Sequence, residues 1–432
     1  MAAPILGGWP RGTGPRAAGA SCTLPLMTPD DPDPPPLAQL EAAVHRRPGD
    51  AGRWLALAEA YMAADAFELS VPLLEQAVRL APRHAEARRA LVVALQEVGR
   101  GREALTHVRE AIRLDPGDPA DQAFELASAL EEAGDTEGAA DQFRRSIAID
   151  ADRPAAWMRL AFILSKKGKP GDAVPVFERA AELRPGSTRV WNGLADAAAR
   201  AGQLEKAVEA FRRSLAIDPD QPNILCSLGA ILRRLERLDE AAIAFAEAAW
   251  RSPNDGAPLF ALGVVELERS RWSEACRHLR RAACLRPAHA GTWTALARAL
   301  AGAGHARAAL EAARQAVRVA PATFNAQTLL ARRYSAVGRH DDARRALLEA
   351  IRIDPMHPFA HKLLGDNMVA LERFAEAGEI FAFLVEVYPR YLDGWLTLAA
   401  VQAALGHLRP AGSALQRAIL LRSRDQGAPA MV

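Results

Sequence analysis

The chain has 432 residues, 50% of them hydrophobic and 25% charged, so it can bury a large core and is not disordered as a whole. Its 4 cysteines argue against a disulfide scaffold, and no apolar run reaches the roughly 20 residues that a bilayer span needs. A formal net charge of +2 is too close to zero to indicate nucleic-acid binding by itself. We therefore expect a cytoplasmic protein.

Two short segments precede the main body of the chain. Residues 1–35 are rich in proline, glycine, alanine and arginine and show no helical period, so we predict that they are disordered, with Met1 or Met27 as the true start. Within residues 36–50, three apolar residues recur at helical spacing and predict a single N-terminal capping helix: Leu37, Leu40 and Val44.

From residue 51 to residue 423 the sequence repeats with a period of 34 residues, interrupted only by one extra residue, Pro119. We number these units as repeats 1 to 11. They begin at Ala51, Ala85, Ala120, Pro154, Thr188, Pro222, Gly256, Ala290, Phe324, Pro358 and Leu392.

Each repeat has the residue pattern of two amphipathic helices. Position 7 is always leucine, position 8 is alanine or glycine except at Val92, and position 20 is alanine except at Ser70. Large residues fill position 4, tryptophan in five repeats, and position 24, phenylalanine in five. Glycine at position 15 suits a left-handed turn after the first helix, and proline at position 32 ends the second. A single hairpin cannot cover its own apolar face, so we predict an all-α solenoid, a superhelix of stacked helix-turn-helix repeats.

This pattern closely resembles tetratricopeptide repeats over residues 51–423, leaving residues 424–432 as a short tail. The resemblance implies a non-catalytic scaffold for protein–protein interactions. Some resembling arrays are fused to glycosyltransferases or sulfotransferases. The pattern is broken at four positions, where we expect close packing to be weakest: Glu266, Gln402, Leu384 and Ala313.

The sequence contains no catalytic or cofactor motif. A phosphate-binding loop, H-E-x-x-H and paired C-x-x-C are all absent. His357 and His361 are four residues apart, but Pro358 lies between them, so surface residues are the better interpretation than a metal pair. Cys276 and Cys284 are too far apart along one helix for a disulfide and are interpreted as small packing residues. We therefore predict no enzyme activity, no metal and no cofactor.

In the family that the chain resembles, the first helices line a concave groove and positions 2, 5, 9, 12 and 13 face it. In repeats 1 to 3 these positions include the acidic residues Glu59, Glu86, Glu97, Asp121, Glu131 and Glu132. In repeats 4 to 6 they include the basic residues Lys166, Arg189, Arg200, Arg233 and Arg234. This reversal is either a functional polarity or merely a set of solvated faces.

Apolar residues at the same inward positions mark a candidate site for an acidic peptide or helical segment with an apolar anchor. The predicted partner-binding groove consists of Phe124, Met158, Phe162, Lys166, Arg189, Asn192, Arg200 and Arg233. A second apolar set, Phe260, Val264 and Leu267, lies in repeat 7. The alternative for both sets is packing against the neighbouring first helix.

A second class of function stays open: a recruiting subunit of an enzyme complex, such as a glycosyltransferase or sulfotransferase, or of a nucleic-acid or membrane-associated assembly. Residues 251–350 hold 16 basic and 8 acidic residues. Most of these basic residues fall on second helices, interleaved with acids and without aromatics for base stacking, which makes nucleic acid an unfavoured partner.

The second helix of repeat 11 is predicted to expose an apolar surface, formed by Leu415, Ala418, Ile419, Leu420 and Leu421. We expect residues 423–432, rich in glycine and proline, to be too short to form a covering helix. A second copy of the chain would bury this surface in a two-fold contact, giving a homodimer. The alternatives are that the last helix frays or that the tail folds back.

Overall fold

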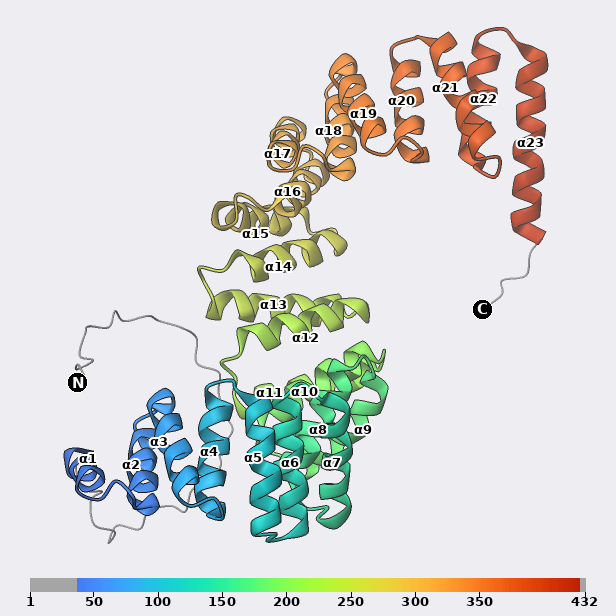
Figure 1. Cartoon of the computed structure of the whole chain (residues 1–432). Helices are drawn as coiled ribbons and strands as arrows, with labels where there is room; N and C mark the ends of the chain where they lie inside the picture. The colour runs from blue at the N-terminus through green and yellow to red at the C-terminus, as the bar shows by residue number, and fades with distance from the viewer. Residues whose placement is uncertain (1–36, 428–432) are drawn as a thin grey trace. The chain divides into compact units, whose positions relative to one another are not determined.

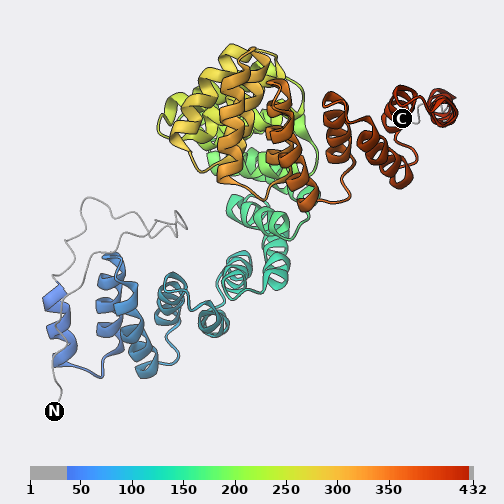
Figure 2. The same ribbon diagram turned by 90° about the horizontal axis from the view of Figure 1, so that it is seen from above.

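The computed structural model describes residues 37–427, with side chains placed as far as Arg422. These residues form 23 α-helices and no β-strand, which confirms the all-α prediction. The first helix, α1 (Leu37–Arg46), stands alone and is followed by eleven helix pairs. Figures 1 and 2 show that, within each unit of the chain, helices that are consecutive in sequence lie side by side. The fold is an α-solenoid of tandem hairpins.

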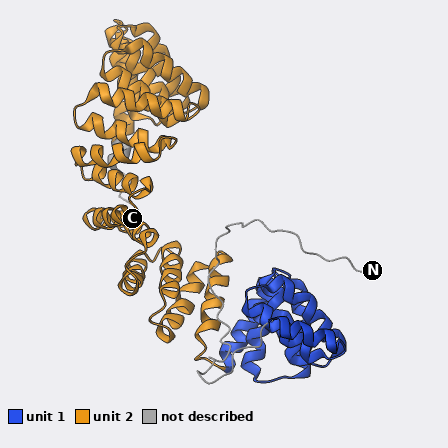
Figure 3. Ribbon diagram, turned by 90° about the vertical axis from the view of Figure 1, so that its left-hand side faces the viewer, with its two compact units in different colours: residues 1–149 blue, residues 150–432 orange. Residues whose placement is uncertain are grey.

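The helices divide into two compact units, coloured separately in Figure 3. The N-terminal unit ends at Ile149 and the C-terminal unit begins at Asp150. After α1, the helices of the N-terminal unit are α2 (Ala51–Ala63), α3 (Phe67–Leu80), α4 (Ala85–Glu97), α5 (Gly101–Leu114), α6 (Pro119–Glu132) and α7 (Thr136–Ile149).

The C-terminal unit contains the helices of repeats 4 to 11. Its first helices are α8 (Pro154–Lys166), α10 (Thr188–Arg200), α12 (Pro222–Arg234), α14 (Gly256–Glu268), α16 (Ala290–Gly302), α18 (Phe324–Ala336), α20 (Pro358–Ala370) and α22 (Leu392–Ala404). Its second helices are α9 (Pro170–Leu183), α11 (Leu204–Ile217), α13 (Leu238–Arg251), α15 (Trp272–Leu285), α17 (Ala306–Val319), α19 (His340–Ile353), α21 (Phe374–Val387) and α23 (Leu408–Gly427).

The helix boundaries follow the sequence period closely. First helices begin at the predicted first position of every repeat except repeat 3, where α6 begins one residue earlier, at Pro119. That helix has 14 residues instead of 13, so it absorbs the extra residue of the sequence. At the other end, α23 continues to Gly427 and has 20 residues, six more than α21. The helix therefore runs beyond Ser423, where the repeat pattern ends.

Every hairpin turns through a left-handed residue at position 15. Seven repeats have the predicted glycine there, with φ between 74° and 89°. The other four have a side chain in the same conformation, which is costly for an L-residue: Asp65, Glu236, Ser270 and Glu372. The packing of the two helices therefore requires a left-handed residue at position 15 even where that residue is not glycine.

The core is built from the positions that the period singled out. Leucine at position 7 is buried in ten repeats, whereas Leu126 is only half-buried. The phenylalanines at position 24 are all buried: Phe143, Phe177, Phe211, Phe245 and Phe381. Small residues at position 8 give these rings room; a Cβ added to Gly365 would lie 2.5 Å from Phe381 Cζ.

Position 4 has a role that the sequence pattern did not reveal. In eight repeats its side chain hydrogen-bonds the backbone carbonyl six residues earlier, in the loop before the helix. All five tryptophans donate this bond through the indole N–H, at 2.8 to 2.9 Å. Arg88, Gln327 and His361 replace tryptophan in the same bond.

The irregular positions are accommodated individually. Ala313 and Leu384 are completely buried, so the packing around them is closed. Glu266 is also buried, and Arg269 binds its carboxylate at 2.8 Å. Its second oxygen, Oε2, lacks a hydrogen-bond partner. Among these three positions, only Glu266 buries a polar atom without a hydrogen-bond partner, which costs free energy.

Candidate functional site

First helices of neighbouring repeats touch each other directly. In the C-terminal unit α8 contacts α10, and α12, α14, α16, α18 and α20 form a continuous series of such contacts. In the N-terminal unit α2 contacts α4. Within each of these series the first helices thus lie side by side.

An aromatic side chain lies at the centre of the α8/α10 contact. Phe162 is half-buried and packs edge-on against Phe177, with ring centroids 5.0 Å apart. The Arg189 guanidinium lies over its ring, 5.3 Å from the centroid. Gly193 leaves space for both rings, because a Cβ there would lie 2.5 Å from Phe177 and 3.2 Å from Phe162. Met158, one turn earlier on α8, is half-buried.

Asn192 presents an unsatisfied hydrogen-bond acceptor on the same face. Its amide nitrogen donates to Gln221 Oε1 at 2.9 Å. Gln221 is held in turn by its own amide, which donates to Ser214 Oγ at 3.1 Å. The Oδ1 atom of Asn192 is buried and lacks a hydrogen-bond partner. A buried acceptor without a donor costs free energy, so a ligand N–H would be favoured there.

Three basic residues of the predicted groove differ in how far they are neutralised. Lys166 is exposed and forms no ion pair with any residue that the structure describes. Arg200 lies 3.7 Å from Asp196 on its own helix and donates to Ser165 Oγ at 3.0 Å, which ties α10 to α8. Arg233 lies 3.9 Å from Glu268. We call Met158, Phe162, Lys166, Arg189, Asn192 and Arg200 the α8/α10 face.

Phe124, the remaining predicted groove residue, belongs to the N-terminal unit. Its ring packs edge-on against Phe143 of the same hairpin, with centroids 5.5 Å apart. Glu59 is one of the acidic residues predicted to face the groove in this unit. Burial raises the pKa of its carboxyl, and the negative charge of Glu86 on the next first helix raises it further.

The apolar set of repeat 7 is largely part of the core. Leu267 is buried, and Phe260 packs edge-on against the His289 ring with centroids 5.0 Å apart. Phe260 and Val264 are partly buried against the core. The packing interpretation therefore accounts for this set, and it offers no free anchor site.

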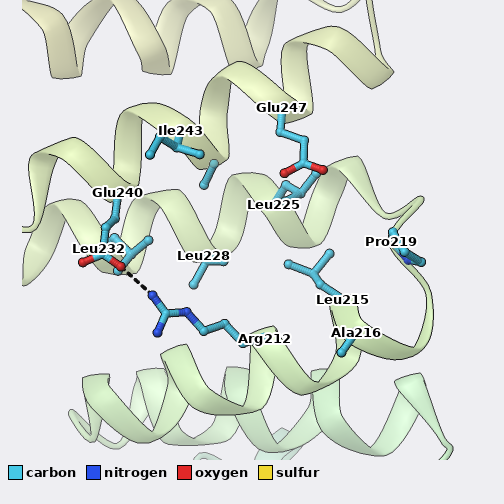
Figure 4. A pocket seen from close by; sticks show the side chains of 11 residues that line it. Arg212, Leu215, Ala216, Pro219, Leu225, Leu228, Leu232, Glu240, Ile243 and Glu247 are labelled. Atoms are coloured by element: carbon cyan, nitrogen blue, oxygen red, sulfur yellow. Dashed lines mark hydrogen bonds and ion pairs between the residues drawn. The ribbon is translucent and has the colours of Figure 1, made fainter.

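A cavity of about 430 Å³ opens between the second helices α11 and α13. Figure 4 shows Leu225, Leu228 and Leu232 of α12 along it, with Arg212 and Glu240 joined by an ion pair of 2.5 Å. Repeat 6 has leucine at position 4, where five repeats have tryptophan. That leucine, Leu225, lines the cavity.

A second cavity of about 310 Å³ lies between α18 and α20 and is lined by Arg332, Arg333, Ser335, His340 and Asn367. Position-by-position comparison of the repeats would have found it. Position 10, which is apolar in the other nine repeats, is arginine in repeat 9 and asparagine in repeat 10.

The last helix exposes part of the predicted apolar surface. Leu415, Ile419 and Leu420 are 46%, 58% and 55% exposed, and Leu421 is half-buried. Ala418 is buried at 1% exposure, so its prediction as a surface residue is wrong. It points toward the packed side of α23, as Ala414 does.

His357 and His361 each contact nearby backbone, and Cys276 and Cys284 differ in burial. In residues 37–427 no cluster of three or more metal-ligating side chains occurs. His357 accepts a hydrogen bond from the backbone of Phe359, and His361 lies 2.8 Å from the Pro355 carbonyl. Cys276 is buried as predicted, but Cys284 is exposed and is not a packing residue.

No helix among the described residues has both the length and the apolar content that a membrane crossing requires.

The architecture defines the class of protein as an α-solenoid of helical hairpins, and sequence comparison supplies the family. The family model described as tetratricopeptide repeat matches residues 55–119 and 328–382. The model described as cilia and flagella-associated protein 70 C-terminal domain, a domain of such repeats, matches residues 121–327. The chain belongs to the tetratricopeptide repeat family. No curated protein matches it.

Several solved structures are similar. YrrB, reported as a TPR protein with an unusual peptide-binding site, has 19% identity and a TM-score of 0.36, covering 43% of this chain and 95% of YrrB. The Cut9–Hcn1 assembly of the APC/C has 16% identity and a TM-score of 0.39, covering 77% and 81%. MamA from Desulfovibrio magneticus RS-1 has 25% identity and a TM-score of 0.37, covering 39% and 95%.

Proposed function

We propose that this protein is a non-catalytic scaffold that binds a peptide or helical segment of a partner protein on the α8/α10 face. Tetratricopeptide repeats form extended surfaces suited to such binding, because each hairpin contributes one strip of side chains to a continuous face. The observation that carries the proposal is the half-buried Phe162 ring beneath Arg189, beside the unpaired Lys166.

The chemistry of this face favours a particular ligand. An apolar side chain that covers Phe162 and Met158 would be desolvated and would supply affinity. Acidic residues flanking it would meet Lys166, Arg189 and Arg200 and would set the register. A backbone N–H of the bound segment would satisfy Asn192 Oδ1.

An array of acidic peptides, each with one central Phe, Leu or Ile, tests this proposal. Wild type should bind a subset, and Phe162→Ala and Lys166→Glu should each weaken that binding at least tenfold. Phe383→Ala is the matched control, because Phe383 lies on the second helix α21 and is 41% exposed. Unchanged binding by both groove variants, with native circular dichroism, would show that the site is elsewhere.

The recruiting-subunit alternative makes a different prediction. A subunit that brings an enzyme to nucleic acid should be retained on heparin or DNA in a strongly salt-dependent manner. Retention that is lost at modest salt, together with no peptide binding, would favour that alternative over a peptide-binding scaffold.

A second candidate interaction is self-association through α23. Leu415, Ile419 and Leu420 form an exposed apolar strip on this helix, and Leu408 near its start is 75% exposed. Covering apolar surface gains roughly 25 cal/mol per Å², and a two-fold contact would cover two identical strips at once. We propose a homodimer through this strip.

A further inference from the structure

Two neighbouring repeats depart from the array at the same position. Position 10 of the first helix is alanine, valine or isoleucine in nine repeats and is buried in eight of them. Arg333 takes this place in α18, and Asn367 takes it in α20. A core position that accepts a polar side chain twice in succession costs stability unless that side chain binds something.

Both polar side-chain atoms of Asn367 have hydrogen-bond partners within the protein. It is 3% exposed, and its amide nitrogen donates to the His340 backbone carbonyl at 2.9 Å. Its Oδ1 lies 3.2 Å from His340 Nδ1 and accepts from Ser335 Oγ at 3.3 Å. This network fixes α20 against the start of α19 and forms one wall of the 310 Å³ cavity.

Arg333, in contrast, has neither a full set of hydrogen-bond partners nor a counter-charge. It is half-buried, its Nε is inaccessible and lacks a hydrogen-bond partner, and it pairs with no carboxylate among residues 37–427. Burial lowers the pKa of its guanidinium, and the positive charge of Arg332 lowers it further. Arg332 is exposed and has no ion pair with the described residues either.

The other charges around the cavity do not neutralise this pair. Asp366 lines the cavity, but Lys362 binds its carboxylate at 2.8 Å and balances its charge. Arg339 and Asp342, on the next helix, form their own ion pair. Two positive charges therefore remain without counter-charge beside a cavity that also contains the Ser335 hydroxyl.

We propose that this cavity binds a dianionic oxyanion of the phosphate type, either free phosphate or a phosphate monoester. Arginine forks bind such oxygens in pairs, and a dianion offsets both guanidinium charges, whereas one carboxylate would offset only one. Arg332 and Arg333 hold the anion, and Ser335 donates a further hydrogen bond. The site is separate from the α8/α10 face, so its existence does not depend on peptide binding there.

The test uses the full chain and measures affinity by calorimetry and melting temperature by circular dichroism, at constant ionic strength set with chloride. Inorganic phosphate should bind and raise the melting temperature. Arg333→Met and Arg332→Met should each weaken binding at least tenfold. Arg307→Met, which removes an exposed charge from α17, should bind as wild type does.

Two further probes distinguish the source of the phosphate. N-acetyl-phosphoserine amide represents a phosphorylated partner, and glycerol 3-phosphate represents a lipid headgroup. Tighter binding of one monoester than of inorganic phosphate identifies that source, whereas equal binding identifies free phosphate.

The proposal is overturned if phosphate does not bind at millimolar concentration, or if all three arginine variants bind phosphate as wild type does. Without ligand, Arg333→Met should melt no lower than wild type, because it removes an uncompensated charge.

Discussion

The indole N–H of Trp191 donates a hydrogen bond of 2.8 Å to the backbone carbonyl of Pro185, in the loop before its helix. Trp54, Trp157, Trp293 and Trp395 make the same bond in their own repeats. Tryptophan at position 4 therefore combines an apolar ring that fills the interface with a polar group that fixes the preceding loop. In these repeats the bond connects the first helix to the loop that follows the preceding helix.

Removing only the polar part of this contact should cost little but measurable stability. Trp191→Phe keeps an aromatic ring and loses the N–H, so we expect a loss of about 1 kcal/mol in the free energy of unfolding, measured by urea denaturation. Trp250→Phe is the control, because Trp250 is 77% exposed and makes no such bond. Equal effects of the two substitutions would refute the role assigned to the bond.

Repeat 6 offers the reverse experiment. Leu225→Trp should fill part of the 430 Å³ cavity and bring an indole N–H toward the Pro219 carbonyl, raising stability by about 1 kcal/mol. Leu259→Trp in repeat 7 is the comparison, since Arg281 already donates to the Pro253 carbonyl there. A loss of stability in Leu225→Trp would mean that the cavity walls cannot accept the ring.

Substitutions at position 15 of two repeats should change the stability in opposite directions. Glu236 has φ of 59°, so Glu236→Gly should stabilise the protein by about 0.5 to 1 kcal/mol because strain is relieved. Gly202 has φ of 80°, and Gly202→Ala should destabilise it by about 1 kcal/mol. The urea midpoint of each variant is compared with that of wild type. Changes of the same sign in both variants would contradict the role assigned to the left-handed turn.

His107 should make the N-terminal unit sensitive to acid. Burial lowers the pKa of its imidazole, and the nearby Arg88 guanidinium, 3.4 Å from Nδ1, lowers it further. The unfolded chain therefore takes up a proton at higher pH than the folded chain, so stability falls as pH drops below about 6.5. His107→Gln should reduce the difference in urea midpoint between pH 7.5 and pH 5.5. The exposed His407 provides the control His407→Gln, which should leave that difference unchanged.

Self-association through α23 predicts a concentration-dependent dimer. Sedimentation at micromolar concentration should show a dimer that Ile419→Glu dissociates, because the substitution places a charge on the exposed strip. Phe162→Glu, on the α8/α10 face, should leave the dimer intact. A strictly monomeric wild type would rule out this interaction.

The repeat period by itself determined most of the architecture. Position 7 leucines, position 20 alanines and position 15 glycines specify two helices and one left-handed turn, because these constraints are local to each hairpin. Since eleven repeats agree in phase, the helix starts could be predicted almost to the residue. The left-handed turn at Glu236 could not be predicted, because glutamate is not a residue type that favours a positive φ.

The candidate sites depended on contacts between repeats, which a single-sequence pattern does not contain. Phe162 and Arg189 were predicted to share a face, but the placement of Arg189 over the ring follows from how α8 packs on α10. In the sequence Arg333 differs only by standing at a position that is apolar in nine other repeats, and the burial of its unpaired Nε follows from how α18 packs. The sequence determined which residues each hairpin presents, and tertiary packing decided which of them meet, since burial and charge pairing depend on the neighbouring repeat.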